Sequence, residues 1–194
     1  MKEMRVKMKK QEWKPGNMLY PVPVVMVSCA REGEKPNIIT VAWAGTICSD
    51  PVMLSISVRK ERYSHGIISD TKEFVVNLTT QFLCRATDYC GVKSGKDIDK
   101  FKEMNLTPVQ SNVVKAPSIA ESPVNIECRV VDIKELGSHD MFLAEVVSVS
   151  VDETLLDENE RLDLEKANLI AYSHGEYFML GEKIGKFGFS VAKR

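Results

Sequence analysis

Alternation of apolar and polar residues is the strongest pattern in the first half of the chain. Between Met53 and Lys60, apolar residues alternate with Ser55, Ser57 and Arg59. Successive side chains of a strand point to opposite faces, so this segment is predicted to be a strand with one buried and one polar face. The segments 24–30, 38–44 and 73–78 are predicted to be strands on the same grounds.

The second half of the chain is also rich in predicted strands. Two alternating segments, 125–133 and 140–151, are joined by a short polar connection that is typical of a hairpin, and residues 172–180 are predicted to form a last strand. Short helices are predicted near 64–69, 79–89 and 97–104. This order predicts a mainly β protein with an antiparallel barrel and a few short helices, rather than a parallel doubly wound sheet.

Length and composition indicate one globular domain. The chain has 194 residues, 44% of them hydrophobic and 27% charged, which is enough for a substantial core. Residues 1–17 are predicted to be a polar arm, and residues 18–194 the domain. The net charge of −1 provides no basic surface, so we expect no nucleic-acid partner.

The cysteines and histidines do not indicate a metal site. The five cysteines form no CxxC pair, and the three histidines are scattered along the chain. An odd number of cysteines without an apolar secretion segment predicts a cytoplasmic protein. The longest apolar stretch, residues 20–30, contains two prolines and is too short to span a bilayer, so no membrane association is expected.

The polar face of the 53–60 segment suggests an anion site. A guanidinium beside hydroxyl groups suits a phosphate, because its planar fork donates two parallel hydrogen bonds. Ser64 is predicted to cap a helix whose free N–H groups would also favour an anion, and His65 lies beside it. We therefore expect an anionic ligand between Arg59 and Ser64. The alternative is that these residues form the solvated face of a sheet and an ordinary helix cap.

The segment 38–44 suggests how a flat ligand could approach the backbone. Thr40, Ala42 and Ala44 are small and share one predicted face, where backbone groups could contact the edge of a ring. The residues 45–51 are predicted to be a loop that reverses the chain at Asp50-Pro51. Cys48 in this loop would lie near such a ring or be an inert thiol.

Other polar residues have two interpretations each. Asn77 lies in an otherwise apolar strand, so it either caps neighbouring backbone groups or faces something polar. Lys93 and Ser94 lie in a loop that could contact phosphate or nicotinamide, although surface lysines usually have no such role. No G-x-G-x-x-G, Walker A or G-x-S-x-G motif occurs, so Rossmann, P-loop and nucleophile-elbow chemistry is not indicated.

Six sequence blocks, in this order, resemble one known family. They are PVPVVMVSC at 21–29, NIITVAWAGTICSDPVMLSISVRKERYSHGII at 37–68, EFVVNL at 73–78, CGVKSGKDIDKF at 90–101, GSHDMFLAEVVSV at 137–149 and GEYFMLGEKIG at 175–185. Together they resemble the flavin reductase-like family, whose domain is an FMN-binding split barrel and which includes the flavoredoxins. The resemblance covers nearly the whole chain.

The resemblance implies a cofactor, an assembly and a reaction. It implies noncovalent FMN in a cleft near the interface of a homodimer, and hydride transfer from NADH or NADPH to the flavin. The reduced flavin would then pass electrons to a small-molecule substrate or another electron acceptor. The cofactor carries this chemistry, while the protein orients it.

The resemblance also assigns roles to residues of this chain. His139 would lie near the flavin and the reductant, which makes it the candidate catalytic residue. The phosphate would be held by Ser57, Arg59 and Ser64, with His65 nearby, and Asn77 would lie near the polar tail of the flavin. The isoalloxazine ring would lie along Thr40, Ala42, Trp43, Ala44 and Thr46.

Two other functions fit the same residues. One is an FMN-binding electron carrier that receives electrons from another protein and has no nicotinamide site. The other is a flavin-binding module without turnover. Nothing in the sequence identifies the terminal electron acceptor or distinguishes NADH from NADPH.

Overall fold

Seven antiparallel strands form the main sheet of the structure, a computed structural model that describes residues 8–192. Their order across the sheet is β3-β2-β6-β9-β10-β5-β4. The strands are β2 (Val25–Cys29), β3 (Asn37–Val41), β4 (Ala44–Ser49), β5 (Val52–Arg59), β6 (Glu73–Leu78), β9 (Val124–Glu135) and β10 (His139–Val151). The two edge strands, β3 and β4, follow one another in the chain, so the sheet curls into a barrel that is split between them.

The barrel interior holds the principal hydrophobic core. Inward-facing residues of β2, β3, β5, β6, β9 and β10 pack together there, as the two-residue period of a strand requires. Helix α1 (Tyr63–Thr71) covers one end of the barrel and contributes Ile67 and Ile68, both fully buried. The largest fully buried side chains, Phe74 and Phe142, come from β6 and β10.

A second core lies outside the barrel, where two helices cover β2 and β3. Helix α2 (Cys84–Val92) and helix α3 (Lys100–Glu103) pack Leu83, Cys90 and Phe101 against Met26 and Ile38. Strands β2 and β3 are therefore buried on both faces. Their almost continuous apolar composition follows from this burial.

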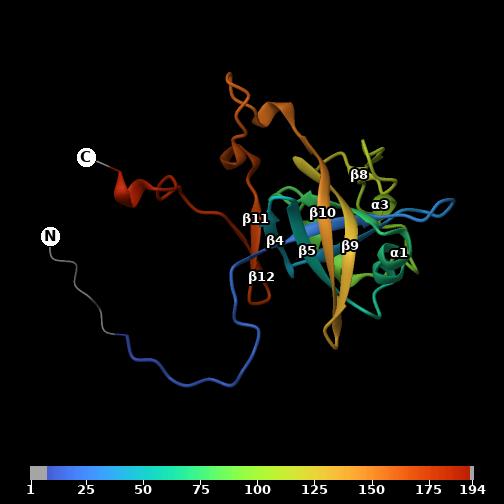
Figure 1. The fold of residues 1–194 in the computed structure, drawn as a ribbon, viewed down its shortest axis with the longest axis horizontal. Helices are drawn as coiled ribbons and strands as arrows, with labels where there is room; N and C mark the ends of the chain where they lie inside the picture. The colour runs from blue at the N-terminus through green and yellow to red at the C-terminus, as the bar shows by residue number, and fades with distance from the viewer. Residues whose placement is uncertain (1–7, 193–194) are drawn as a thin grey trace.

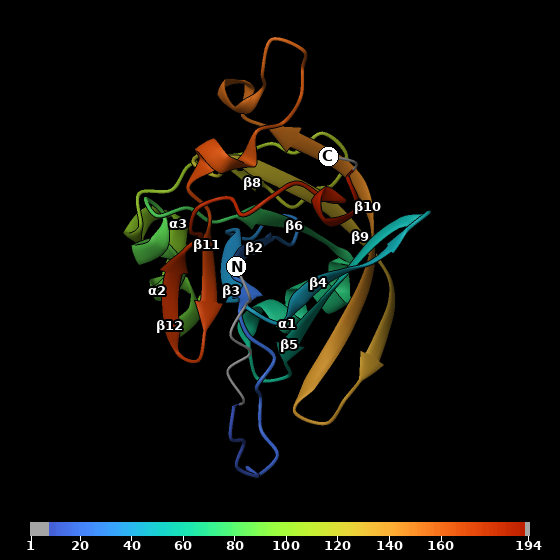
Figure 2. The ribbon, with the colours of Figure 1, turned by 90° about the vertical axis from the view of Figure 1, so that its left-hand side faces the viewer.

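A small sheet and several short elements complete the fold. The small sheet has the order β1-β11-β12, with β1 at Val22–Pro23, β11 at Ile170–Ser173 and β12 at Glu176–Met179. Residues 8–19 and 181–192 extend away from the barrel on the side of this sheet (Figure 1), and Figure 2 shows the same molecule from that side. The short elements are β7 (Pro108–Val109), β8 (Ser118–Ile119) and the 3-10 turns Glu153–Leu155, Leu164–Ala167 and Phe189–Val191.

The structure confirms the mainly β barrel with a few short helices, and it corrects several element predictions. The segment 38–44 is not one strand, because β3 ends at Val41 and β4 begins at Ala44. The predicted loop 45–51 is mostly strand β4, whose small and exposed residues show no alternation because β4 is an edge strand paired to β5 alone. Helix α2 begins later than predicted and contains Gly91.

The predicted last strand, residues 172–180, is also wrong. It is a hairpin, because the chain reverses at His174 and Gly175, which both have positive φ (50° and 96°). Positive φ suits glycine and the turns of two-residue hairpins. The hairpin brings Tyr172 and Tyr177 opposite each other, with ring centroids 5.7 Å apart.

The predicted N-terminal arm is described only in part, and the described residues contain neither a membrane-spanning helix nor a metal-binding cluster. Residues 1–7 of the predicted arm lie outside the described residues, and residues 8–21 contain no helix or strand. Within the described part of the chain, every helix falls short of the length and apolarity needed to cross a bilayer. Residues 8–192 contain no cluster of three or more His, Cys, Asp or Glu side chains that could hold a metal ion.

Candidate functional site

The split of the barrel forms an open cleft. Ala42 and Trp43 lie in the bend between β3 and β4, and the Ser57 backbone N–H donates to the Trp43 carbonyl at 2.8 Å, which ties the bend to β5. Two adjoining depressions, of about 400 and about 540 Å³, share Ala42, Trp43 and Ser57. We call them together the open cleft, and each has the size of a small-molecule site.

Most of the predicted ligand contacts line this cleft. The first depression is lined by residues 39–43, by Ser57, Val58, Arg59, Glu61 and Arg62, and by His139 and Tyr172. The second adds residues 16–19, Val22, Ala44, Gly45 and Ser55. The structure therefore brings together Thr40, Ala42, Trp43, Ala44, Ser57, Arg59 and His139.

Arg59 and His139 are neighbours across two strands. They are register partners in the antiparallel pair of β5 and β10, so their side chains share one face of the sheet. The Arg59 side chain is 55% exposed and lies 3.7 Å from the Glu61 carboxylate. Burial and the charge of Arg59 both hold the pKa of His139 below its usual value, so its imidazole is neutral at neutral pH.

The hydrogen bonds of His139 leave one ring nitrogen available. Its Nδ1 lies 2.9 Å from the Ser138 hydroxyl. Its Nε2 has no hydrogen-bond partner among the described residues. A neutral imidazole on the wall of the cleft can therefore donate or accept one further hydrogen bond.

Aromatic side chains form a wall that the sequence did not reveal. Tyr172 of β11 lines the cleft, and the Tyr20 ring lies 6.1 Å from the Tyr172 ring and 6.4 Å from the Trp43 ring, between centroids. These rings come from three distant parts of the chain, so no local pattern could place them together. Their large apolar faces suit a flat ligand.

Ser64 and His65 do not join Arg59 in the open cleft. The residue that caps α1 is Arg62, and no side chain makes a cap hydrogen bond, so the prediction of Ser64 as the cap is wrong. The Ser64 hydroxyl is buried and accepts a hydrogen bond from the Asn37 amide at 2.7 Å. Helix α1 starts one residue before Ser64, which turns this side chain towards β3.

His65 belongs to the end of the barrel. Its Nε2 lies 2.8 Å from the Asp140 carboxylate, and its ring packs edge-on against Phe142 with centroids 5.3 Å apart. Asp140 follows His139 in the chain but points to the opposite face of β10, because side chains alternate along a strand. The structure therefore contradicts the prediction that His65 lies beside Arg59 at an anion site.

Asn77 is also separate from the open cleft. Its side chain is fully buried, and its amide nitrogen lies within 3.2 Å of the Met26 carbonyl, the Ser28 hydroxyl and the Val75 carbonyl. Its amide oxygen accepts from the Ile119 N–H at 3.0 Å and from the Asn125 amide at 2.8 Å. Asn77 thus connects neighbouring strands, which is the first of its two predicted interpretations, and it is not near the cleft.

Thr40, Thr46 and Cys48 have different surroundings in the structure. Thr40 lines the cleft, but its hydroxyl donates to the Thr87 carbonyl of α2 at 2.5 Å, since this side of β3 is covered by the helix. Thr46 is exposed on β4 and lines neither depression. The Cys48 thiol lies 3.4 Å from the Asp50 carbonyl, outside both depressions.

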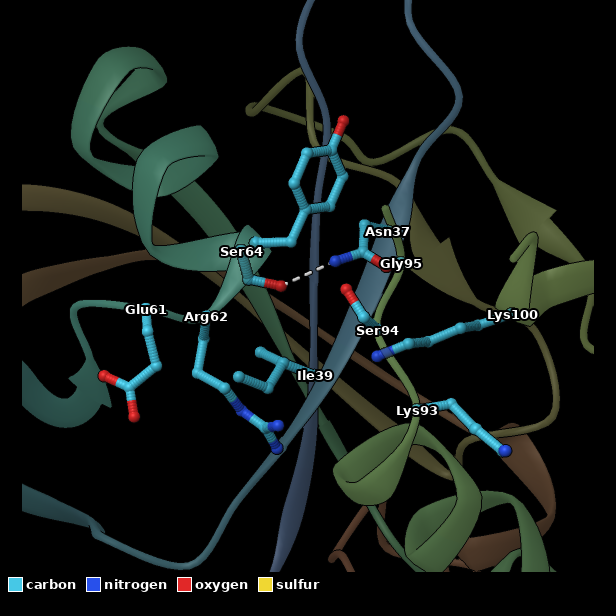
Figure 3. A pocket seen from close by; sticks show the side chains of 10 residues that line it. Asn37, Ile39, Glu61, Arg62, Ser64, Lys93, Ser94, Gly95 and Lys100 are labelled. Carbon is cyan, nitrogen blue, oxygen red and sulfur yellow. Dashed lines mark hydrogen bonds between the residues drawn. The ribbon is translucent and has the colours of Figure 1, made fainter. Parts of the chain in front are cut away.

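A smaller cavity adjoins the open cleft. It measures about 140 Å³ and shares Ile39, Glu61 and Arg62 with the cleft. We call it the Arg62–Lys100 cavity, and Figure 3 shows it from close by. Its remaining lining residues are Asn37, Tyr63, Ser64, Lys93, Ser94, Gly95 and Lys100.

Comparison with known proteins identifies related domains. A family model described as "Flavin reductase like domain" matches residues 17–181. Flavoredoxin of Desulfovibrio vulgaris (Miyazaki F) superposes with a TM-score of 0.88 at 32% identity, covering 95% of this chain and 100% of that one. Flavoredoxin of Methanosarcina acetivorans superposes with a TM-score of 0.85 at 27% identity, with the same coverage.

One relative with a named activity is a reductase. The reductase component of an FADH(2)-dependent resorcinol hydroxylase from Rhizobium sp. (strain MTP-10005) is 26% identical over 144 residues, which are 72% of this chain and 78% of that one. The matches agree with the split-barrel fold described above and with the sequence blocks that first indicated it.

Proposed function

Because this chain belongs to the flavin reductase-like family, we propose that the protein binds FMN and oxidises NADH or NADPH. The observation that carries the proposal is the open cleft, where Ser57, Arg59 and His139 line the same depression as the aromatic residues Trp43 and Tyr172. A flavin is the cofactor that the family indicates. FMN rather than FAD, and a nicotinamide as donor, are the further parts of this proposal.

The residues of the cleft fit a flavin by size and by chemistry. Each depression lies within the range of about 300–1,000 Å³ that is typical of small-molecule sites. Tyr172 and Trp43 offer apolar faces for a ring, and Ala42 and Ala44 add small side chains to the lining. The Arg59 guanidinium and the Ser57 hydroxyl supply donors for the polar atoms of the ligand.

The protein's contribution to the reaction is positioning and electrostatics. When bound, the flavin supplies two-electron chemistry, accepting a hydride and releasing electrons. Arg59 places a positive charge beside the cleft, which favours negative charge on a bound ligand. Neutral His139 offers Nε2 to a nicotinamide amide or to a substrate, which would hold the donor at a fixed distance from the ring.

We also propose that the protein is a homodimer. Several large apolar side chains are exposed on the two extended ends, namely Trp13, Leu19, Ile184 and Phe187. Residues 16–19 line the open cleft, so the arm that would meet a second copy also borders the site. Light scattering of the purified protein tests the mass, and a monomer at micromolar concentration would contradict this part of the proposal.

Anaerobic mixing with NADH and NADPH tests the activity. We expect the flavin absorbance to bleach with at least one of them in the absence of any partner protein. His139→Ala should slow the bleaching by about tenfold or more, because a positioned contact is lost, while FMN affinity changes less. His139→Asn retains a donor and serves as the conservative control.

Two other results would favour the alternative functions. Bleaching that requires an added protein donor would favour an electron carrier without a nicotinamide site. A purified protein that neither contains flavin nor binds added FMN, FAD or riboflavin would contradict the proposal as a whole. Titration with these three flavins also tests whether FMN is preferred over FAD.

A further inference from the structure

We propose that Ser138 is a positioning residue, which holds the neutral His139 ring in the tautomer that carries its proton on Nε2. The open cleft then presents a hydrogen-bond donor at this point, and its partner is an oxygen acceptor, the carboxamide oxygen of the nicotinamide. This inference rests on the proposed function, because that function places a nicotinamide at His139. It adds which ring nitrogen carries the proton and which residue decides it.

The turn between β9 and β10 places Ser138 beside His139. Strand β9 ends at Glu135 and β10 begins at His139, so residues 136–138 make the turn. The Leu136 N–H donates to the His139 carbonyl at 2.9 Å, and Gly137 has a φ of 82°, in the left-handed region that glycine adopts freely. A left-handed residue is usual in hairpin loops of this length. The closed turn therefore keeps the hydroxyl next to the ring.

The contact between these two side chains permits two neutral tautomers. The Ser138 hydroxyl lies 2.9 Å from Nδ1 of His139, within hydrogen-bonding range. If the hydroxyl donates, Nδ1 carries a lone pair and Nε2 carries the proton. If the hydroxyl accepts, the proton lies on Nδ1 and Nε2 can only accept a hydrogen bond.

The basicity of the two possible acceptors favours donation by the hydroxyl. A neutral imidazole nitrogen takes up a proton near pH 6.5, whereas an aliphatic hydroxyl oxygen is a far weaker base. The O–H···N arrangement is therefore the stronger one, and serine–histidine catalytic pairs have the same polarity. Ser138 is exposed and makes no other side-chain hydrogen bond among residues 8–192, so no other described group competes for its proton.

The surroundings of the ring keep it neutral, which this selection requires. His139 pairs with Arg59 across two strands. Burial, followed by the charge of Arg59, lowers the pKa of His139, while the Glu61 carboxylate acts in the opposite direction. A protonated ring carries hydrogen on both nitrogens, so Ser138 could no longer select between them. At neutral pH the ring is uncharged and the selection operates.

The donors around Nε2 suit an oxygen rather than an amino group. Within the described part of the chain, Nε2 of His139 has no hydrogen-bond partner. Arg59 on the neighbouring strand offers donors only, and it lines the same depression. A nicotinamide carboxamide has an oxygen acceptor at one end and N–H donors at the other. The tautomer of His139 therefore decides which end of the carboxamide faces the wall of the cleft.

The first experiment determines the tautomer by nitrogen-15 NMR of the full chain at about pH 8, without added flavin or nicotinamide. His139→Asn identifies the signals of this ring among the three histidines. In the wild type, Nε2–H should be the main form. Ser138→Ala removes the hydroxyl, so the ratio of Nε2–H to Nδ1–H should fall by about fivefold, the equilibrium equivalent of one net hydrogen bond. Ser138→Thr keeps the hydroxyl and should keep the wild-type ratio.

Ser138→Asp is expected to reverse the tautomer. An ionised carboxylate only accepts hydrogen bonds, so it takes the proton of Nδ1 and leaves Nε2 with a lone pair. Ser49 provides the matched control, because it is an exposed serine that lines neither depression of the cleft. Ser49→Ala should leave the ratio unchanged. A dominant Nε2–H form in Ser138→Asp would contradict control of the ring by residue 138.

The second experiment identifies the acceptor in the flavin-loaded protein. Thio-NADH and thio-NADPH carry sulfur in place of the carboxamide oxygen, and sulfur is a weak acceptor. Ser138→Ala should lower kcat/KM by about fivefold with the natural nicotinamide and by less than about twofold with its thio analogue. The affinity for FMN should change by less than about twofold, because Ser138 lines neither depression.

Three outcomes would overturn the inference and leave the proposed function intact. The first is an unchanged tautomer ratio in Ser138→Ala. The second is an equal loss of kcat/KM with the natural and the thio nicotinamide. The third is a loss of FMN affinity instead, which would place the acceptor on the flavin. If no nicotinamide bleaches the flavin, the proposed function fails, while the NMR measurement still tests the role of Ser138.

Discussion

Two polar regions of this protein differ in how their hydrogen-bonding groups are satisfied. In the first, which we call the polar seam, four buried residues and the partly buried Asn125 join β2, β6 and β9 to the segment 111–119, which contains β8. The four buried residues are Ser28, Asn77, Ser118 and Glu127. Asn77 makes five contacts with protein groups, and Glu127 accepts from three backbone N–H groups at 2.7–3.0 Å. The protein itself supplies every partner of these two side chains.

The open cleft and the adjoining cavity are different. Arg59 is more than half exposed, His139 has a free ring nitrogen, and Lys100 keeps one donor beyond its two carbonyl partners. Polar groups that a fold places together and leaves with spare donors are available to a ligand. Polar groups that are buried and fully paired stabilise the fold.

The comparison shows why residue type alone is a weak guide to function. Asn77 and Lys100 are both buried polar residues in or beside the barrel. Their hydrogen bonds distinguish them. Protein groups satisfy the Asn77 amide on both its nitrogen and its oxygen, whereas Lys100 keeps one donor for a ligand. Substitutions in the polar seam should therefore lower stability, and substitutions in the open cleft should weaken ligand binding.

The largest effect is expected from Asn77→Leu. This change removes the hydrogen bonds of Asn77 with the Ile119 N–H, the Met26 carbonyl and the Asn125 amide, so the free energy of unfolding should fall by about 3 kcal/mol or more. Chemical denaturation measures the loss. The exposed turn residue Asn159 provides the control, since Asn159→Ala should change stability by less than about 0.5 kcal/mol.

FMN binding by Asn77→Leu tests whether Asn77 has a structural role alone. The folded fraction of Asn77→Leu should bind FMN as the wild type does, because Asn77 lies away from the cleft. A stable variant with weakened FMN affinity would mean that Asn77 contacts the flavin after all.

A smaller loss of stability is expected from Glu127→Gln. Burial alone would raise the pKa of Glu127, but the N–H groups of Asn112, Val114 and Val113 outweigh it and hold the pKa below its usual value. Replacing the carboxylate should cost about 2 kcal/mol near neutral pH, since bonds to a charged acceptor are lost.

The pH dependence of this loss has a definite sign. A carboxyl whose pKa is lowered by folding stabilises the protein above its unfolded pKa, and that contribution disappears as the pH falls through the folded value. The difference between Glu127→Gln and the wild type should therefore shrink below about pH 4. A difference that grows on acidification would contradict the role assigned to this carboxylate.

The third prediction concerns the cleft. Arg59→Ala should weaken FMN binding by about 1.5 kcal/mol or more, the lower range for a hydrogen bond to a charged group, with little change in stability because the side chain is exposed. Riboflavin binding should weaken by a similar amount if Arg59 contacts the ring or ribityl chain, and by less if it contacts the phosphate. Titration of both flavins against Lys60→Ala, an adjacent exposed cation, provides the control.

Much of the barrel could be predicted from local patterns. Strands β5 and β6 match the predicted segments within one residue, because each alternates or is continuously apolar between clear turn residues. Strand β4 could not be predicted, because it is an exposed edge whose only support is pairing to β5. The hairpin of β11 and β12 was missed, because its turn is formed by His174 and Gly175 rather than by a usual hairpin dipeptide.

The candidate site was predicted in part. The alternation of β5 placed Ser57 and Arg59 on one face, and strand pairing then set Arg59 opposite His139, although they are far apart in the chain. Ser64 and His65 were predicted to join them, yet the start of α1 at Tyr63 directs them elsewhere. Lys93 and Ser94 were noted as loop residues, but nothing local associates them with Arg62 and Lys100.

The sequence by itself determined the family, the strand-rich fold and the polar face of β5, because these depend on composition, order and a period of two residues. The tertiary structure decided which polar groups are paired and which keep free donors. That distinction depends on contacts between residues dozens of positions apart, such as Lys100 with Ile38 and Asn77 with Met26. Burial and pairing are properties of the packed molecule, so no local pattern in the chain can specify them.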